Sequence, residues 1–308
     1  MIWISEADVR RLPVSAAADV IEEALGRLEI SDDLPRAALP FAGGQLLMMP
    51  SAVDGVGIKV LTVREGSSGP MTPRIQGIYM LMNPATLAPA ALIDGPALTC
   101  LRTPAVSIAA LRRLARPDSS RLVVFGAGPQ ALGHVLAVCA ERPIATVTVV
   151  APRPEAASAL VAKLTAAGIA GAVGSPEAVA EAEIVICATT ASTPVFDGRL
   201  IADEACVVAV GSHEPAKREL DAALIGRATV VVEDVATAMR EAGDVVQAVR
   251  EGALRAEDLV PLNALISGPA GHHGRPRVFK SVGMAWEDLV VARHLAELAS
   301  QELAPQPS

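Results

Sequence analysis

A glycine-rich turn is the first part of this sequence whose residue types and spacing could support chemistry. It reads Gly126-Ala-Gly128-Pro-Gln-Ala131 and directly follows the apolar run Arg121–Phe125. A strand, such a turn and then a helix form the phosphate-binding unit of dinucleotide-binding proteins. Gly126 permits the tight turn, and Gly128 lets the backbone approach a phosphate. The segment therefore predicts a site for a nicotinamide or flavin nucleotide.

The residues after the turn have the order that such a unit needs. An apolar helical stretch runs through Cys139, and a second apolar run, Thr146–Val150, follows it. Residues 184–188, 206–210 and 229–232 read as further strands that are apolar on both faces, as a parallel sheet between helices requires. We expect an α/β fold with a doubly wound Rossmann sheet of five or six such strands.

The end of the second strand bears on the choice of coenzyme. NAD-preferring units place Asp or Glu about 20 residues after the glycines, where the carboxylate binds the ribose hydroxyls. This chain has Ala151-Pro-Arg153 there instead. A guanidinium can pair with a 2′-phosphate, so we expect NADP(H) to be preferred, with NAD(H) possible. The alternative is that Arg153 is a solvated residue at the start of the next helix.

Three cations could hold an anionic substrate. Lys59 lies within the otherwise apolar run Gly57–Val63, where a charge is costly unless it faces a polar site. Arg102 precedes Thr103-Pro104, which reads as a helix N-cap and first helical residue, so a helix N-terminus would add to an anion site. Arg36 is the third candidate. Each alone could equally be a surface cation.

The order of predicted strands and helices along the chain indicates two domains. Residues 36–94 read as short strands of an antiparallel sheet, before any nucleotide-binding unit begins. The polar breaker at residues 116–120 is the expected border. The final helix, with Trp286 and Leu289 on its buried side, is expected to return to the first domain, although periodicity alone also allows it to cap the Rossmann sheet. We therefore expect a discontinuous α+β domain of residues 1–115 with 284–308, and a Rossmann domain of residues 116–283.

Composition excludes several classes of protein. The 308 residues carry a net charge of −8 and only 2% aromatic residues, which disfavours nucleic-acid binding. No apolar run has the length of a membrane span, and residues 1–11 lack the apolar core of a signal peptide. Four widely spaced cysteines without metal-ligand spacing suggest reduced thiols and a cytoplasmic protein without a bound metal.

Four motifs, in this order, resemble the ornithine cyclodeaminase/mu-crystallin family. They are residues 92–107, the glycine-rich turn, residues 210–221 (Val-Gly-Ser-His-Glu-Pro-Ala-Lys-Arg-Glu-Leu-Asp) and residues 279–289 (Phe-Lys-Ser-Val-Gly-Met-Ala-Trp-Glu-Asp-Leu). The resemblance spans nearly the whole chain. It implies a homodimer whose first domain binds the substrate and forms the dimer.

The resemblance also implies roles for single residues. Cations matching Arg36, Lys59 and Arg102 bind the α-carboxylate of an amino or imino acid, and Lys59 can donate a proton as the C–N centre changes charge. The positions that resemble cofactor contacts are Thr103, Gly126, Ala127, Gly128, Pro129, Gln130, Thr189, Thr190, Val210 and Ser281, to which Arg153 is added from its spacing.

His213 is a departure from the family pattern. Ornithine cyclodeaminases have an aspartate at the matching place, and an imidazole supplies no permanent negative charge. We therefore expect reduction of a small cyclic ketimine carboxylate, pyrroline-2-carboxylate or piperideine-2-carboxylate, to proline or pipecolate, with His213 as an acid. His213 could instead only shape the pocket, and the His272-His273 pair reads as a solvated loop.

Three other functions remain open from the sequence. One is ornithine cyclodeaminase activity, in which bound NAD is used without net redox change. Another is a non-catalytic protein that binds NADPH or another ligand, as mu-crystallin does. Alanine dehydrogenases and enzymes that make diamino acids are further branches of the family.

Overall fold

The computed structural model describes residues 1–28, 30, 33–65, 73–268 and 274–303, and the chain forms two compact units. Unit 1 consists of Met1–Arg102 and Met284–Ser308, and unit 2 is Thr103–Gly283. These units divide within helix α3 (Gly95–Leu114) and before Met284, and the domain borders expected from the sequence lie after residue 115 and before residue 284.

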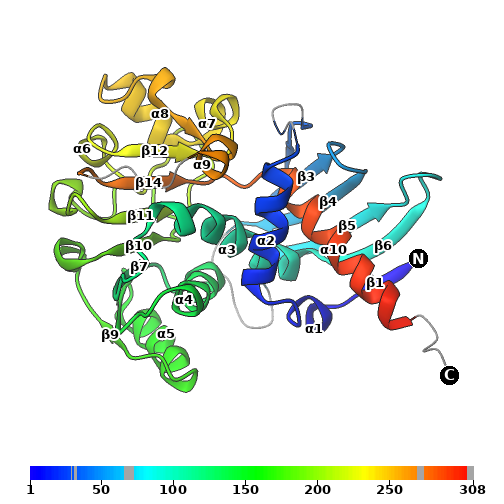
Figure 1. Ribbon diagram of the computed structural model, residues 1–308, viewed down its shortest axis with the longest axis horizontal. Helices are drawn as coiled ribbons and strands as arrows, with labels where there is room; N and C mark the ends of the chain where they lie inside the picture. The colour runs from blue at the N-terminus through cyan, green and yellow to red at the C-terminus, as the bar shows by residue number, and fades with distance from the viewer. Residues whose placement is uncertain (29, 31–32, 66–72, 269–273, 304–308) are drawn as a thin grey trace. The chain divides into compact units, whose positions relative to one another are not determined.

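Unit 1 contains a six-stranded sheet in the order β1-β6-β5-β4-β3-β2, antiparallel except for the parallel pair of β1 and β6 (Figure 1). The strands are β1 (Ile2–Ile4), β2 (Ala37–Phe41), β3 (Gly44–Ser51), β4 (Gly57–Arg64), β5 (Ile75–Met82) and β6 (Pro89–Asp94). The sequence pattern predicted β3 to β6. It missed the short edge strands β1 and β2.

Helices α1 (Glu6–Val9), α2 (Val14–Leu25) and α10 (Ala285–Leu303) complete unit 1. A capping box at Ser5 and Asp8 begins α1: Ser5 N–H donates to Asp8 Oδ2 at 2.9 Å, and Asp8 N–H donates to Ser5 Oγ at 3.4 Å. Helix α10 packs against α2 and against strands β1, β3, β4 and β5. The last helix of the chain therefore covers the sheet built by the first hundred residues.

One row of the sheet shows which side chains face these helices. Met49 pairs with Lys59, Lys59 with Tyr79, and Tyr79 with Ile93. Side chains opposite one another in a sheet point to the same face. All four are buried, so Lys59 lies on the covered face of the sheet.

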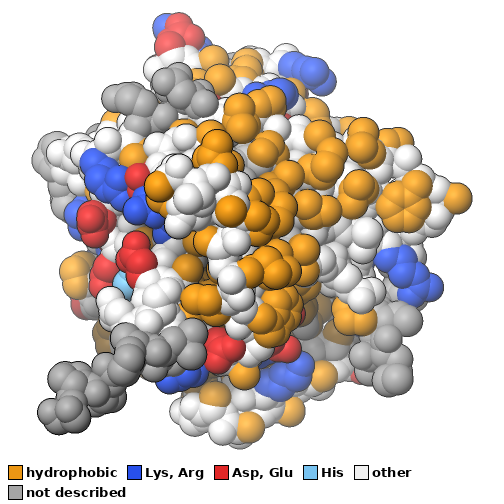
Figure 2. Space-filling model, turned by 90° about the vertical axis from the view of Figure 1, so that its right-hand side faces the viewer, with side chains coloured by type: hydrophobic (Ala, Val, Ile, Leu, Met, Phe, Trp, Pro, Cys, Tyr) orange, Lys and Arg blue, Asp and Glu red, His pale blue; other side chains and the backbone are white. Residues whose placement is uncertain are grey.

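The other face of the sheet is largely apolar, with Asp94 at the end of one row and Thr62 and Gln76 in another. Alternation places on it two register rows, Met48, Val60 and Ile78, and Pro50, Ile58, Met80 and Leu92. Trp3, Leu39 and Phe41 are about half exposed, at 55, 50 and 51%. Hydrophobic side chains gather over a broad part of the surface shown in Figure 2. A sheet with one solvated face normally carries polar residues there, so this face departs from that pattern.

Unit 2 contains an eight-stranded parallel sheet in the order β13-β12-β14-β11-β10-β7-β8-β9. The strands are β7 (Arg121–Phe125), β8 (Thr146–Val150), β9 (Gly171–Val173), β10 (Ile184–Cys187), β11 (Cys206–Ala209), β12 (Thr229–Val232), β13 (Val260–Pro261) and β14 (Arg277–Lys280). The parallel α/β fold is confirmed. Every residue of β10, β11 and β14 is buried.

The remaining elements of unit 2 connect these strands. The helices are α4 (Pro129–Glu141), α5 (Pro154–Ala166), α6 (Ala222–Ile225), α7 (Val235–Glu241), α8 (Gly243–Arg250) and α9 (Leu262–Ser267), with the short 3₁₀ helices η2 (Pro176–Glu181), η3 (Gly198–Leu200) and η4 (Ala256–Asp258). Elements η4, β13 and α9 lie between α8 and β14.

The start of helix α3 differs from the sequence prediction. The helix begins at Gly95, where Asp94 Oδ1 accepts a hydrogen bond from Ala97 N–H at 2.8 Å, as an N-cap does. Thr103 is therefore not the N-cap, and Pro104 lies inside the helix. An interior proline costs about 3 kcal/mol. Burial of the apolar residues around Pro104 offsets this cost, because Ala105, Val106, Ile108, Ala109 and Ala110 are almost fully buried.

The described residues form no helix that is both long enough and apolar enough to cross a membrane. All four cysteines are free thiols. Burial raises the pKa of the Cys206 thiol to about 12 and that of Cys139 to about 11, so both stay protonated at neutral pH.

Candidate functional site

The glycine-rich turn of unit 2 lies where β7 ends and α4 begins. Gly126 has a φ of +106°, which favours glycine, and its N–H donates to Val150 O on the neighbouring strand at 2.9 Å. A Cβ at Gly126 would lie 2.4 Å from Ala188 O, just after β10. The turn is therefore packed closely against the ends of two adjacent strands.

Gly128 is open where Gly126 is crowded. It is exposed, and nothing lies within 4 Å of the place where its Cβ would stand. It is the N-cap of α4 without a side-chain cap, and Pro129 follows as the first helical residue. The backbone N–H groups of the first turn of a helix point outward and attract anions. Together with the flanking Ala127 and Gln130, this cradle fits a pyrophosphate.

Arg153 follows β8, the strand next to β7. It is the N-cap of α5, is exposed, and forms no ion pair with another described residue. Its guanidinium is therefore free to bind an anionic group beside the end of β8.

The remaining expected cofactor positions of unit 2 follow three further strands. Thr189 and Thr190 come after β10, Val210 after β11 and Ser281 after β14. These strands and β7 are neighbours in the sheet. Because parallel strands end at one edge, the structure brings these residues to the same edge as the glycine-rich turn. Ligands of open α/β sheets bind at this edge.

Two buried glutamates, which the sequence analysis missed, hold these loops in place. Glu219 Oε1 accepts from Thr189 N–H at 2.8 Å and from Thr189 Oγ1 at 2.7 Å, while its Oε2 accepts from Gly211 N–H at 2.7 Å. Glu233 accepts from Ser281 Oγ at 2.7 Å and from Val282 N–H at 2.8 Å. Each carboxylate fixes the backbone directly after a strand.

A buried ion pair supports Glu219. Lys280 Nζ lies 3.0 Å from Asp244 Oδ2, and both side chains are fully buried. Asp244 Oδ1 accepts from the backbone N–H of Glu219 at 2.7 Å. Burial raises the pKa of Glu219, although the charge of Lys280 and the hydrogen bonds from Thr189 oppose the shift.

In unit 1, Lys59 meets helix α10. Its Nζ lies 2.7 Å from Asp288 Oδ2, and the two side chains are 1% and 0% exposed. Burial and the charge of Arg102 lower the pKa of Lys59 to about 8, although Asp288 and Glu287 oppose the shift. Lys59 is thus a lysine that can give up and regain a proton near neutral pH.

Arg102 joins Lys59 through the same carboxylate. Its Nε donates to Asp288 Oδ1 at 3.1 Å, and its Nη1 donates to Glu287 Oε2 at 2.6 Å. Because helix α3 begins at Gly95, Arg102 lies in the helix interior. The expected contribution of a helix N-terminus at Thr103 was wrong, because Thr103 lies inside α3.

The third expected cation, Arg36, directly precedes β2 and is half-buried. Ala37 pairs with Met48, which precedes Met49 in the row of Lys59. Arg36 therefore lies at the end of β2 nearest that row.

His213 lies in the loop after β11 and is exposed. The adjacent Ser212 Oγ donates to Lys217 O at 2.7 Å, which closes this loop. His272 and His273 lie outside the described residues. His134 is buried in α4.

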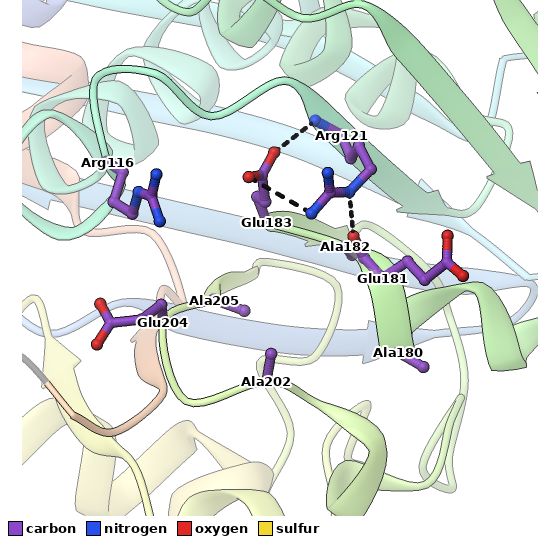
Figure 3. A pocket seen from close by; sticks show the side chains of 9 residues that line it. All are labelled: Arg116, Arg121, Ala180, Glu181, Ala182, Glu183, Ala202, Glu204 and Ala205. Carbon is purple, nitrogen blue, oxygen red and sulfur yellow. Dashed lines mark hydrogen bonds and ion pairs between the residues drawn. The ribbon is translucent and has the colours of Figure 1, made fainter.

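A small cavity of about 140 Å³ lies at the opposite edge of the unit 2 sheet (Figure 3). Arg121 opens β7 there, and Glu183 and Ala205 directly precede β10 and β11. In Figure 3 the guanidinium of Arg121 points toward Glu183 and the backbone of Glu181. Its cations pair with neighbouring carboxylates, and the cavity lies at the amino ends of the strands, so we do not assign it to the cofactor.

Comparison with known proteins shows the family of this chain. The sequence model of the ornithine cyclodeaminase/mu-crystallin family matches residues 4–302. A Delta(1)-pyrroline-2-carboxylate reductase of Bacillus cereus is 39% identical over 282 residues, which cover 86% of this chain and 85% of the relative.

Solved structures share the fold of this chain. The Delta(1)-pyrroline-2-carboxylate reductase of Thermococcus litoralis, in complex with NADH and L-proline, superposes with a TM-score of 0.91 at 27% identity and covers all of both chains. An archaeal alanine dehydrogenase dimer with bound NAD superposes with a TM-score of 0.89 at 26% identity, covering 99% of this chain and 98% of that chain.

Proposed function

We propose, since the chain belongs to the ornithine cyclodeaminase/mu-crystallin family, that it reduces a small cyclic ketimine carboxylate with NAD(P)H. Pyrroline-2-carboxylate and piperideine-2-carboxylate are the expected substrates, and proline and pipecolate the products. The observation that carries the proposal is the joining of Lys59 and Arg102 by the single carboxylate of Asp288. Two buried N–H donors of this kind are suited to a carboxylate substrate.

Lys59 and Arg102, with Arg36, would bind the substrate carboxylate. Arginine presents a planar fork of donors to a carboxylate, and lysine presents a compact charge. Reduction of an imine also needs a proton at the nitrogen. With a pKa of about 8, Lys59 is mostly protonated at neutral pH and can supply that proton, then regain one from water.

The unit 2 residues fit a dinucleotide because Gly128 leaves open backbone at the N-terminus of α4. The residues that would hold it are Gly126, Ala127, Gly128, Pro129, Gln130, Thr189, Thr190, Val210 and Ser281, with Thr103 from helix α3. When bound, a reduced nicotinamide supplies the hydride for the substrate Cα. Glu219 and Glu233 keep the contacting loops rigid.

We assign the preference for NADP(H) to Arg153, which has no carboxylate partner among the described residues. His213 is proposed as a second acid that helps to keep the imine nitrogen protonated. Its exposure in this structure is compatible with exchange of protons with solvent.

The test is a substrate panel. Purified protein is mixed with NADPH or NADH and with pyrroline-2-carboxylate, piperideine-2-carboxylate, ornithine, or pyruvate plus ammonia, and the absorbance of the reduced coenzyme is followed. We expect steady coenzyme oxidation with the cyclic imines and formation of proline or pipecolate. The Lys59→Gln variant should lose at least about a hundredfold in kcat/KM while still binding NADPH.

Other outcomes would replace the proposal. Ammonia released from ornithine without net coenzyme turnover would identify a cyclodeaminase. Tight NADPH binding with no turnover of any compound would identify a binding protein.

We further propose that the protein is a homodimer that buries the outer face of the unit 1 sheet. Met48, Val60 and Ile78 form an apolar row across three central strands of that face. An apolar sheet face of this breadth is unfavourable in water and typical of an interface. The archaeal alanine dehydrogenase described above is a dimer.

A further inference from the structure

We propose that Asp288 is a positioning residue that holds Lys59 and Arg102 as one unit and keeps Lys59 protonated at neutral pH. The proposal deepens the proposed function and rests on it for the role of Lys59 toward the substrate. No role for Asp288 could be deduced from its own place in the sequence, since it lies 229 residues from Lys59 and 186 from Arg102.

Asp288 uses both carboxylate oxygens, one for each cation. Oδ2 accepts from Lys59 Nζ at 2.7 Å, and Oδ1 accepts from Arg102 Nε at 3.1 Å. The carboxylate is planar and fully buried, so turning it toward one cation moves its other oxygen away from the second. The directions of the two donors are therefore coupled through this side chain.

Glu287, the preceding residue of α10, binds Arg102: its Oε2 accepts from Arg102 Nη1 at 2.6 Å. The four side chains carry two positive and two negative charges and are all at least nine-tenths buried. Removing Asp288 would leave two buried cations with one carboxylate. An uncompensated buried charge is strongly unfavourable, and a lysine relieves it by losing its proton.

The charged groups near Lys59 act in opposite directions. Arg102, from α3, favours the neutral amine, whereas Asp288 and Glu287, from α10, favour the ammonium ion. Tyr79 faces Lys59 from β5, and burial together with the charges of Asp288 and Asp33 raises its pKa well above the usual value. Tyr79 therefore stays uncharged, and Asp288, which binds Nζ directly, is the main group that keeps the lysine protonated.

The chain contains only four lysines, Lys59, Lys163, Lys217 and Lys280, so their titration can be followed individually. The experiment is NMR of protein labelled at the lysine Cε, titrated without substrate or coenzyme, with the Lys59 signal assigned by Lys59→Arg. In the unsubstituted protein we expect a pKa of about 8 for Lys59. In Asp288→Asn, which keeps the shape and loses the charge, we expect it to fall by about one unit or more.

Glu287→Gln is the matched control, since it removes a neighbouring buried carboxylate whose hydrogen bond goes to Arg102. We expect a shift of the Lys59 pKa less than half as large. Equal shifts in the two variants, or a Lys59 pKa unchanged in Asp288→Asn, would overturn the proposal. Should Asp288→Asn not fold, the same titration of Asp288→Glu decides: the Lys59 pKa must stay near that of the unsubstituted protein, and a fall of about one unit contradicts the role of the charge.

Activity gives a second, separable measurement. If the enzyme reduces cyclic imines, the basic limb of the kcat profile in Asp288→Asn should move to lower pH by the same amount as the Lys59 pKa. The dissociation constant for the coenzyme should change by less than about twofold, because Asp288 lies in unit 1 and the residues proposed to bind the coenzyme lie in unit 2. A limb that stays in place while the Lys59 pKa moves would contradict the link to catalysis. An enzyme inactive on every substrate, with the Lys59 shift present, would reject the proposed function alone.

Discussion

The side chains that matter most in this protein are charged residues in buried positions, where an unpaired charge is energetically unfavourable. Lys59, Asp288, Lys280 and Asp244 are fully buried, and each forms a short ion pair. A buried pair adds little net stability, but losing one partner costs several kcal/mol. Such pairs are therefore best explained by the positions they fix. In unit 1 the fixed groups are the two cations, and in unit 2 they are the loops after the strands.

Arg153 carries a prediction at the same scale. Arg153→Asp removes the guanidinium expected to pair with the 2′-phosphate and adds a carboxylate that repels it. We expect KM for NADPH to rise at least about tenfold, with KM for NADH changing less than about threefold. Initial-rate kinetics with both coenzymes measure this. Lys163→Asp, on the exposed face of the same helix, controls for the change in net charge, and an unchanged ratio between the coenzymes would place the guanidinium elsewhere.

At the scale of elements, helix α4 meets α3 through a buried histidine. His134 Nδ1 lies 2.7 Å from Gln130 O, so this nitrogen must carry a proton, and Nε2 lies 3.0 Å from Ser107 Oγ. In the neutral ring Nε2 accepts from the serine hydroxyl. Burial lowers the pKa of His134 to about 4, which keeps the ring in this neutral form.

His134 makes the stability of the protein sensitive to acid. An unfolded histidine binds a proton below about pH 6.5 and the folded one only below about 4, so the unfolded state binds more protons between these values. Stability therefore falls as the pH drops through this window. Between pH 7 and pH 5 the unsubstituted protein should lose about 2 kcal/mol more than His134→Gln.

Urea unfolding at the two pH values measures the difference. His294→Gln, which removes the half-buried histidine of α10, is the matched control for the loss of an imidazole. If the stability of the His134→Gln variant and that of the unsubstituted protein depend on pH in the same way, His134 binds a proton in the folded state over this pH range, and its pKa is not lowered.

Elements that depend on local chemistry were predictable from the sequence, and contacts between distant elements were not. The capping box at Ser5 and the glycine-rich turn are each formed by residues only a few positions apart in the sequence. The start of α3 was misplaced because Thr103-Pro104 is a good local start signal, whereas Asp94 caps the helix and burial retains the proline. The bonds of Asp288 and Glu219 join residues far apart in the chain. For Asp288, the available signal in the sequence was the acidic pair Glu287-Asp288 between two apolar residues, on a helix with a buried face.

At the scale of the whole molecule, the unit 1 sheet is largely apolar on both faces. Helices α2 and α10 cover one face, which accounts for Leu47, Met49 and Leu61. The other face carries Met48, Val60 and Ile78 in one row. A sheet that is alternately apolar and polar needs one covering layer, and a sheet apolar on both faces needs two. A second copy of the chain supplies that layer in the proposed dimer.

Ile78→Asp tests this arrangement. Ile78 lies on the central strand β5, is 39% exposed, and pairs with Val60 on β4. A carboxylate there would be desolvated in the dimer, and we expect the dissociation constant to rise at least about a hundredfold. Sedimentation velocity over a range of concentrations measures the association. Val173→Asp, at a 48% exposed valine on β9 of unit 2, is the matched control and should remain dimeric. An Ile78→Asp variant that sediments as the same dimer would show that this sheet face is not the interface.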